Sequence, residues 1–426
     1  MLFGSATLLR AVFLIAAATI GVAGAAQAAT LSTLHPFCHS ANCADGSEPE
    51  AGLLLDPNGN LFGTATSGGT ANNGGTVFEL VPSAGTYAFH VVHAFCHDSV
   101  CPDGQLPNAG LIRDVNGNLY GLAEGGGAHG EGSMFELSPN GTGWTYKVLY
   151  NFCSHTGCND GVRPLATLSY QGASTGTPYD GTSPVYGTTN GGGAHNEGVV
   201  FQLKPSTTRF WTETTLHAFC SRTSCADGGS PTAGVLVDGA GNVFGVSAQD
   251  GAHGYGIAYE IPAGGSFVVL YTFCQIGNCL DGAYPTDIAF TDSGALIGTT
   301  LEGGSVFSGT IFRLVPNGTH STETVLYNFC IDDVCSDGAQ PRGGLTVDSA
   351  GNYYGVTQFG GASNAGVIFK WDGSQVRVLH SFCARANCAD GEQPFSGVTL
   401  DAAGNLFGTT PFGGAEGSGV AYELLR

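Results

Sequence analysis

The chain has 426 residues, with 13 lysines and arginines against 34 aspartates and glutamates, which gives a formal net charge of −21. Charged residues make up 11% of the sequence, whereas soluble domains commonly have about a quarter. A surface this acidic repels phosphate groups, so composition excludes nucleic acid and anionic membrane as partners. Of the remaining classes, we expect an extracellular glycan or another protein.

The first residues have the pattern of a secretory signal peptide. Arg10 supplies a positive charge, an apolar stretch rich in alanine follows over 11–26, and 26–28 has the small-x-small form of a cleavage site. An uncleaved membrane anchor is the alternative, but the apolar stretch is short for a span of roughly 20 residues. We therefore assign 1–29 to a signal peptide and 30–426 to one domain. The mature protein is expected to be secreted, periplasmic or at the cell surface, with no membrane span.

From there the chain consists of seven copies of one phrase, Phe-Cys-x4-Cys-x-Asp-Gly-x2-Pro. Successive copies begin 53 to 67 residues apart, which is typical of one supersecondary unit repeated head to tail. A phrase that recurs unchanged is more typical of a scaffold than of an active site. The copies begin at Phe37, Phe95, Phe152, Phe219, Phe273, Phe329 and Phe382.

All fourteen cysteines lie in these copies, two in each. An even number at fixed spacing in an exported chain indicates disulfides. Zinc would need four ligands around one point, where each copy offers two, and haem attachment would need a histidine after the second cysteine, which no copy has. Each bridge closes a six-residue loop, called the Cys loop below. The predicted pairs are Cys38–Cys43, Cys96–Cys101, Cys153–Cys158, Cys220–Cys225, Cys274–Cys279, Cys330–Cys335 and Cys383–Cys388.

Each copy contains four short runs of aromatic and β-branched residues separated by turn residues, which is the pattern of strands joined by hairpins. In the second copy these runs are 109–114, 119–123, 133–137 and 144–152. The turn between the second and third runs is called the Gly-rich loop below. Four antiparallel strands repeated seven times predict an all-β fold, a seven-bladed β-propeller of four-stranded blades.

The two ends of this domain have complementary patterns. The segment Leu31–Phe37 resembles an isolated fourth strand, and Val420–Leu425 resembles an isolated third strand. If they pair, the last blade is closed by the N- and C-terminal strands. Because turns of a meander alternate between the two ends of its sheet, the Cys loops and Gly-rich loops are expected to share one face, called the Cys-loop face below.

These phrases resemble the bacterial extracellular tandem repeat called GloVer. The similarity includes Asp390-Gly391 followed by Pro394, the run Gly-Asn-Leu-Phe-Gly-Thr-Thr at 404–410, and Gly-Val-Val-Phe-Gln-Leu at 198–203. It extends over essentially all of the mature chain. The resemblance implies an exported propeller-like protein, and it supplies no catalytic residues because the family has no established activity.

Departures from the repeat are the first candidates for a functional site. The Gly-rich loop has a histidine at one equivalent position in three consecutive copies, His129, His195 and His253. Three imidazoles on one face could bind a divalent metal ion or act as acid and base. The sequence favours the alternative, duplication of a surface histidine, because adjacent blades hold their loop tips apart unless the loops lean inward. The third copy also has an insertion at 170–184, which we expect to be a tolerated extension of an exposed turn.

The aspartate of each phrase has two interpretations, as a calcium ligand or as a cap for the backbone of its Cys loop. Calcium needs six to eight converging oxygens, and no loop contains an acid-rich run, so the sequence favours capping. The seven residues are Asp45, Asp103, Asp160, Asp227, Asp281, Asp337 and Asp390.

These patterns predict a monomeric, disulfide-stapled propeller that acts as a binding or surface-interaction module and needs no cofactor. Ligands are expected on the Cys-loop face near the central channel, where loops of all blades converge. The sequence assigns no catalytic residue. The alternative is a metal-assisted lyase or hydrolase of an extracellular glycan or small molecule, with His129, His195 and His253 around a divalent metal ion.

Overall fold

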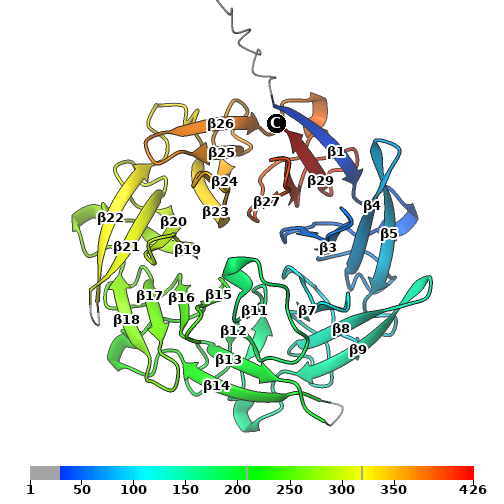
Figure 1. Ribbon diagram of the computed structural model, residues 1–426, viewed down its shortest axis with the longest axis horizontal. Coiled ribbons are helices and arrows are strands. Elements are labelled where there is room, and N and C mark those ends of the chain that lie inside the picture. Colours follow the sequence, from blue (N-terminus) through cyan, green and yellow to red (C-terminus); the bar gives the residue numbers. More distant parts are fainter. Residues whose placement is uncertain (1–28, 208–209, 318–319) are drawn as a thin grey trace, which may run out of the picture.

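Seven antiparallel sheets form a ring in the computed structural model, which describes residues 29–207, 210–317 and 320–426 (Figure 1). Each sheet is a meander of neighbouring strands, and each forms one radial blade. The predicted seven-bladed β-propeller is therefore confirmed. Residues 1–28 of the predicted signal peptide lie outside the described residues. Within the described ranges, no helix has the length and hydrophobicity needed to cross a bilayer.

The first three blades differ mainly in their innermost strand, which blade 3 divides into two pieces that both pair with β12. Blade 1 consists of β2 (Leu54–Leu55), β3 (Leu61–Ala65), β4 (Thr76–Ser83) and β5 (Thr86–Ala94). Blade 2 consists of β6 (Ile112–Arg113), β7 (Leu119–Ala123), β8 (Ser133–Asn140) and β9 (Gly143–Asn151). Blade 3 consists of β10 (Val162–Pro164), β11 (Ser169–Tyr170), β12 (Val185–Gly191), β13 (Val199–Lys204) and β14 (Thr212–Ala218).

Blades 5 and 6 have long innermost strands, whereas blade 7 combines both ends of the domain. Blade 4 consists of β15 (Val235–Val237), β16 (Val243–Ser247), β17 (Ile257–Ile261) and β18 (Val268–Thr272). Blade 5 consists of β19 (Ala283–Phe290), β20 (Leu296–Glu302), β21 (Thr310–Asn317) and β22 (His320–Asn328). Blade 6 consists of β23 (Ala339–Val347), β24 (Tyr353–Phe359), β25 (Val367–Trp371) and β26 (Val376–Ser381). Blade 7 consists of β27 (Thr399–Leu400), β28 (Leu406–Thr410), β29 (Val420–Leu425) and β1 (Thr30–Pro36).

Short 3-10 helices occur only as single turns in the described chain. Five of them lie inside Cys loops, namely η1 (Ala41–Cys43), η2 (Thr156–Cys158), η4 (Thr223–Cys225), η5 (Gly277–Cys279) and η6 (Ala386–Cys388). The sixth, η3 (Ala173–Thr175), lies in the blade 3 insertion.

The hydrophobic core lies between neighbouring blades, and its repeated element is the phenylalanine that opens each Cys loop. All seven of these side chains are fully buried. Each ring contacts an aromatic ring on the third strand of the next blade, with centroids 4.9 to 5.5 Å apart, as Phe37 does with Phe78. A Cβ on Gly63 would lie 2.4 Å from the Phe78 ring, which explains the glycine inside the second strand. The repeated Phe and Gly therefore define one ring-to-ring contact at every blade junction.

Strand pairing between the two ends closes the ring, as the sequence predicted. The strand β1 pairs antiparallel with β29, from Thr30 opposite Leu425 to Pro36 opposite Val420. In Figure 1 the blue β1 lies beside the red β29 at the same blade. Leu31 is buried in the cluster that joins blades 6 and 7.

The insertion in blade 3 is more than an exposed turn, which corrects the expectation from sequence. Its Tyr179 is fully buried, and the ring lies 5.4 Å from that of Tyr120 in blade 2. The Tyr179 carbonyl accepts a hydrogen bond from the Val115 N–H, and Gln171 donates to the Gly239 carbonyl of blade 4. The insertion therefore connects three blades on the face opposite the Cys loops. Its aromatic residues were the sequence feature that could have predicted this packing.

Loss of the contact made by β1 should destabilise the whole ring. We expect Leu31→Ala to lower the free energy of unfolding by about 2–5 kcal/mol, because it leaves a cavity beneath the closing strand. Leu425→Ala changes a side chain of the same kind on the partner strand, but Leu425 is 44% exposed. That control should change stability by less than about 0.5 kcal/mol. Guanidinium unfolding measures both, and equal effects would contradict closure through β1.

Candidate functional site

The Cys loops are the most regular feature of the face on which ligands were predicted. All seven predicted disulfides are formed, and no cysteine is left free. The carbonyl of each second cysteine accepts a hydrogen bond from the Gly-rich loop that follows it, at 2.8 to 3.0 Å, as Cys43 does from the Gly69 N–H. These bonds confirm that Cys loops and Gly-rich loops share one face.

The aspartate of each phrase caps its Cys loop, as the sequence favoured. In the loop before blade 4, Asp227 accepts hydrogen bonds from the backbone N–H groups of Ser221 and Arg222, both at 3.0 Å. Burial acts to raise the pKa of Asp227, but the hydrogen bonds that it accepts, first from the Ser221 hydroxyl and then from these N–H groups, outweigh burial and lower the pKa. The carboxylate is thus occupied by donors of its own loop and has a structural role.

Sequence analysis missed a second partner of these aspartates. Each one also binds a side chain ten residues earlier, on the outer strand of the preceding blade, as Asp227 binds His217 at 3.0 Å. Every copy has His or Tyr two residues before the opening phenylalanine, so the signal was present in the repeat. The seven partners are His35, His93, Tyr150, His217, Tyr271, Tyr327 and His380.

The blade junctions differ according to which of these two residue types they contain. His35 stacks on Phe89 of the next blade with ring centroids 3.7 Å apart, and His217 stacks on Phe267 in the same way. Where the residue is tyrosine, two junctions place a glutamate at the position of the stacked ring, the buried Glu213 and the half-buried Glu323. Burial raises the pKa of Glu213 to about 7 and that of Glu323 to about 8. These carboxyl groups are therefore protonated in the folded protein over part of the neutral range.

The three histidines proposed from sequence lie on separate Gly-rich loops. His129, His195 and His253 are each exposed. Among the described residues, the only three groups with ligand atoms within 4.8 Å of one another are Cys383, Cys388 and Glu392. The structure thus does not bring the three imidazoles into one such set, and a metal shared by them stays a prediction.

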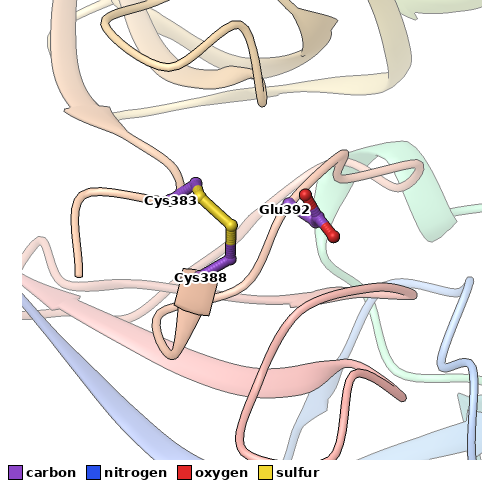
Figure 2. A group of neighbouring side chains, drawn as sticks. All are labelled: Cys383, Cys388 and Glu392. Carbon is purple, nitrogen blue, oxygen red and sulfur yellow. A yellow bond between two sulfur atoms is a disulfide. The ribbon is translucent and has the colours of Figure 1, made fainter. Parts of the chain in front are cut away.

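The group that does meet this distance is unsuited to metal binding in the oxidised protein. Figure 2 shows the disulfide between Cys383 and Cys388, with the Glu392 carboxylate beside it. Metals are bound by thiolates, and a disulfide sulfur carries no thiolate charge. Blade 2 has a glutamine at the equivalent position, where Gln105 Oε1 lies 3.1 Å from the sulfur of Cys101. The cluster is therefore a variant of the Cys-loop contacts.

The central channel is a cavity of about 600 Å³, to which all seven blades contribute. The residue directly after the proline of each phrase lines this channel, where the chain leaves the Cys-loop face and leads to the innermost strand. These seven residues are called the channel ring. The proline before them is invariant, yet the ring contains six residue types. Its members are Glu50, Asn108, Leu165, Thr232, Thr286, Arg342 and Phe395.

The residue before that proline forms a second variable ring, called the rim ring. Every member has a positive φ, between 46° and 57°, although none is glycine. Each donates its N–H to the Gly-rich loop of the preceding blade at 2.7 to 3.0 Å, and this inter-blade bond offsets the strain of the left-handed backbone. The members are Glu48, Leu106, Arg163, Ser230, Tyr284, Gln340 and Gln393.

Charged groups in the channel interact across the mouth. Burial raises the pKa of Glu50, with further contributions from Glu48 and Glu124, while Arg342 acts in the opposite direction. The Arg342 guanidinium lies 5.0 Å from the Phe395 ring centroid and donates to Gln358 Oε1 at 2.8 Å. On blade 5, burial raises the pKa of Asp287 to about 6.

Aromatic rings flank the same mouth on two sides. The rings of Tyr284 and Tyr255 lie 5.4 Å apart at blades 4 and 5, and those of Phe395 and Phe412 lie 6.0 Å apart at blade 7. Tyr284 and Phe395 both line the channel. The mouth thus combines aromatic surfaces with a few carboxylate, amide and hydroxyl groups, which is the usual composition of a small-ligand site.

The ring and its channel define the class, a disulfide-stapled seven-bladed β-propeller with a chemically varied channel mouth. The chain belongs to the Gloeobacter/Verrucomicrobia repeat family, whose profile matches residues 19–185 and 174–422. The resemblance found in the sequence is therefore confirmed. None of the curated proteins is significantly similar to this chain.

Solved structures with a related shape have low sequence identity to this chain. A protein from Lactobacillus plantarum is 13% identical, with 86% of this chain and 99% of that chain covered and a TM-score of 0.46. A putative 6-phosphogluconolactonase from Bacteroides fragilis is 14% identical, with 85% of this chain and 92% of that chain covered and a TM-score of 0.44. An alpha-L-arabinanase from Penicillium chrysogenum, solved with arabinobiose, is 11% identical, with 74% of this chain and 92% of that chain covered and a TM-score of 0.43.

Removal of one capping aspartate should loosen its Cys loop. We expect Asp227→Ala to lower the free energy of unfolding by about 2–4 kcal/mol, because two backbone N–H groups, the Ser221 hydroxyl and the His217 ring lose their charged acceptor. The amides of Ser221 and Arg222 should also exchange faster with solvent, which hydrogen-exchange mass spectrometry measures. Asp292→Ala, at an exposed aspartate, is the control. Unchanged exchange in the Asp227 variant would contradict the capping role.

The half-buried Glu323 of blade 5 should make the free energy of unfolding depend on pH. Because the pKa of Glu323 is raised when folded, the folded state holds a proton that the unfolded state has released between about pH 5 and pH 8. This group therefore contributes less stability as pH rises through that window. We expect Glu323→Gln to be more stable than the wild type at pH 8 and equal to it near pH 5. Glu416→Gln, at an exposed loop tip, should show no such difference in urea unfolding.

Proposed function

We propose that this protein is an exported binding module whose ligand occupies the channel mouth on the Cys-loop face. The observation that carries the proposal is the contrast between an invariant proline and the six residue types of the channel ring beside it. Packing requires the same residues in every blade, as the fully buried phenylalanines illustrate. Variation at positions that line a cavity is instead typical of recognition.

The ligand class follows from the chemistry of the mouth. A formal net charge of −21 repels anionic ligands at long range, which leaves neutral and cationic ones. Tyr284 and Phe395 offer flat apolar surfaces on two sides of the channel, while Asn108, Glu50 and Asp287 offer polar groups for hydroxyls. Apolar ring faces together with hydroxyl partners suit a neutral oligosaccharide, and this is the ligand we propose for a monomeric, cofactor-free propeller.

The metal-assisted lyase or hydrolase is the alternative that the sequence left open. It requires a divalent ion at His129, His195 and His253, whose side chains are exposed on three different loops. Elemental analysis distinguishes the two functions. Stoichiometric metal that is lost when the three histidines are changed to alanine would support the enzyme and count against the binding module.

Oligosaccharide binding can be tested with a panel of neutral and acidic glycans, followed by calorimetry on the best binder. We expect the wild type to bind neutral members, and we expect Phe395→Ala to weaken the affinity by at least about tenfold, because an aromatic face is lost from the mouth. Val115→Ser removes an apolar side chain that is 63% exposed in a turn of the opposite face. This control should leave the affinity unchanged. Equal loss in both variants, or binding of acidic glycans alone, would refute the proposed site.

A further inference from the structure

Blade 5 departs from the other blades at the tip of its Gly-rich loop. One residue at this tip has a left-handed backbone in every blade. In six blades it is glycine or asparagine, the two residue types that best tolerate this conformation. In blade 5 it is Phe307, with a φ of 59°. The other six residues are Asn73, Gly130, Asn196, Gly254, Asn364 and Gly417.

Phenylalanine is a poor residue for this position in two respects. A bulky side chain in the left-handed region costs roughly 1 kcal/mol relative to glycine. In blade 6 the side-chain oxygen of the equivalent Asn364 accepts a hydrogen bond from the Gly360 N–H at 3.0 Å. In blade 3 Asn196 accepts one from the Gly192 N–H at 3.4 Å. A phenyl ring has no such acceptor, so folding alone favours asparagine here. The rim ring differs, because none of its seven members is glycine and each donates its N–H to the neighbouring blade, which offsets the strain.

Packing does not account for Phe307 either. Its side chain is 54% exposed, and none of the ring contacts found in the described chain includes it. A strained residue that gains neither burial nor a hydrogen bond is best explained by an interaction outside the fold.

Loops beside Phe307 also have exposed apolar side chains, which together with Phe307 make up a patch. The blade 5 Gly-rich loop is bonded to the preceding Cys loop through Gly304 N–H and Cys279 O, and to the segment before the next Cys loop through Ser305 N–H and Asn328 Oδ1. Large apolar side chains on these three loops are 47% to 72% exposed. They are Ile276, Leu280, Val306, Phe307, Ile331 and Val334, and together they are called the blade-5 patch.

Charge identifies the kind of partner that fits the patch. Asp332 and Asp333 lie between Ile331 and Val334 and are exposed, whereas the three loops contain no lysine or arginine. A second copy of this chain would bring together two molecules that each have a net charge of −21, and an anionic membrane would be repelled in the same way. A basic surface with apolar side chains is complementary in both respects.

We propose that the blade-5 patch is a docking surface for a protein segment in which an apolar side chain is flanked by lysine or arginine. Phe307 is the central anchor, the other apolar tips surround it, and Asp333 provides charge complementarity. Buried aromatic anchors with a charged periphery are where binding energy concentrates in protein interfaces. This docking proposal does not depend on the channel ligand, so a test of one proposal does not decide the other.

The test uses the whole protein and a labelled peptide, Lys-Lys-Leu-Phe-Lys-Lys, with fluorescence anisotropy as the measurement. We expect Phe307→Asn to weaken peptide affinity by at least about tenfold and to raise Tm by about 1–2 °C, because it introduces the residue that three of the other blades have at this position. Loss of binding with a gain in stability cannot result from misfolding. Asp333→Asn should weaken binding severalfold and reduce its dependence on salt.

Controls separate the patch from general attraction to an acidic protein. Val100→Ser removes an apolar side chain that is 73% exposed from a Cys loop on the same face, and it should leave the affinity unchanged. The peptide with glutamate in place of lysine should not bind. The proposal is overturned if Phe307→Asn binds the lysine peptide as well as the wild type does, or if the glutamate peptide binds equally. It is also overturned if Phe307 instead governs self-association in sedimentation or adsorption to phosphatidylglycerol vesicles.

Discussion

The pairing of β1 with β29 is the interaction on which the rest of the structure depends. Each blade has two apolar faces, and the opening phenylalanine of each Cys loop is buried only if another blade stands beside it. In a row of blades the first and last faces would remain uncovered. Pairing of strands from the two ends of the domain makes blade 7 complete and gives every junction the same ring contact. The channel exists for the same reason, because seven inner strands enclose a cavity only when the ring is closed.

The Cys loops make one face of this closed ring rigid. A disulfide across six residues removes little chain entropy, about 2 kcal/mol at most. All fourteen cysteines, however, have a positive φ between 45° and 63°, a conformation that cysteine rarely adopts alone. The disulfide, the aspartate cap and the hydrogen bond to the Gly-rich loop hold them there together. Loops fixed in this way lose little entropy when a ligand binds, which suits the face to recognition.

The fold could be predicted because its determinants are repeated seven times, so a single sequence contained seven observations of each anchor. The site could be predicted only in part. The channel ring is visible as a variable position after an invariant proline, but its direction toward the channel follows from the inner strand and not from the pattern. The buried role of Tyr179 depends on contacts between blades, and Glu323 depends on a neighbour that sequence spacing does not indicate. The three histidines were proposed because they share a face, but a shared face does not bring loops of different blades together.

Repetition also explains where function can be located on this molecule. A residue that contributes to packing has six equivalents with the same task, so a departure at one blade needs a local reason. At the channel ring the departures are polar, charged and aromatic in turn, and each lies in the cavity. At Phe307 the departure is unfavourable for the loop itself, since Asn364 shows what the same backbone gains from an asparagine. The departures that stability does not explain, in the channel ring and at Phe307, are therefore the ones that recognition best accounts for.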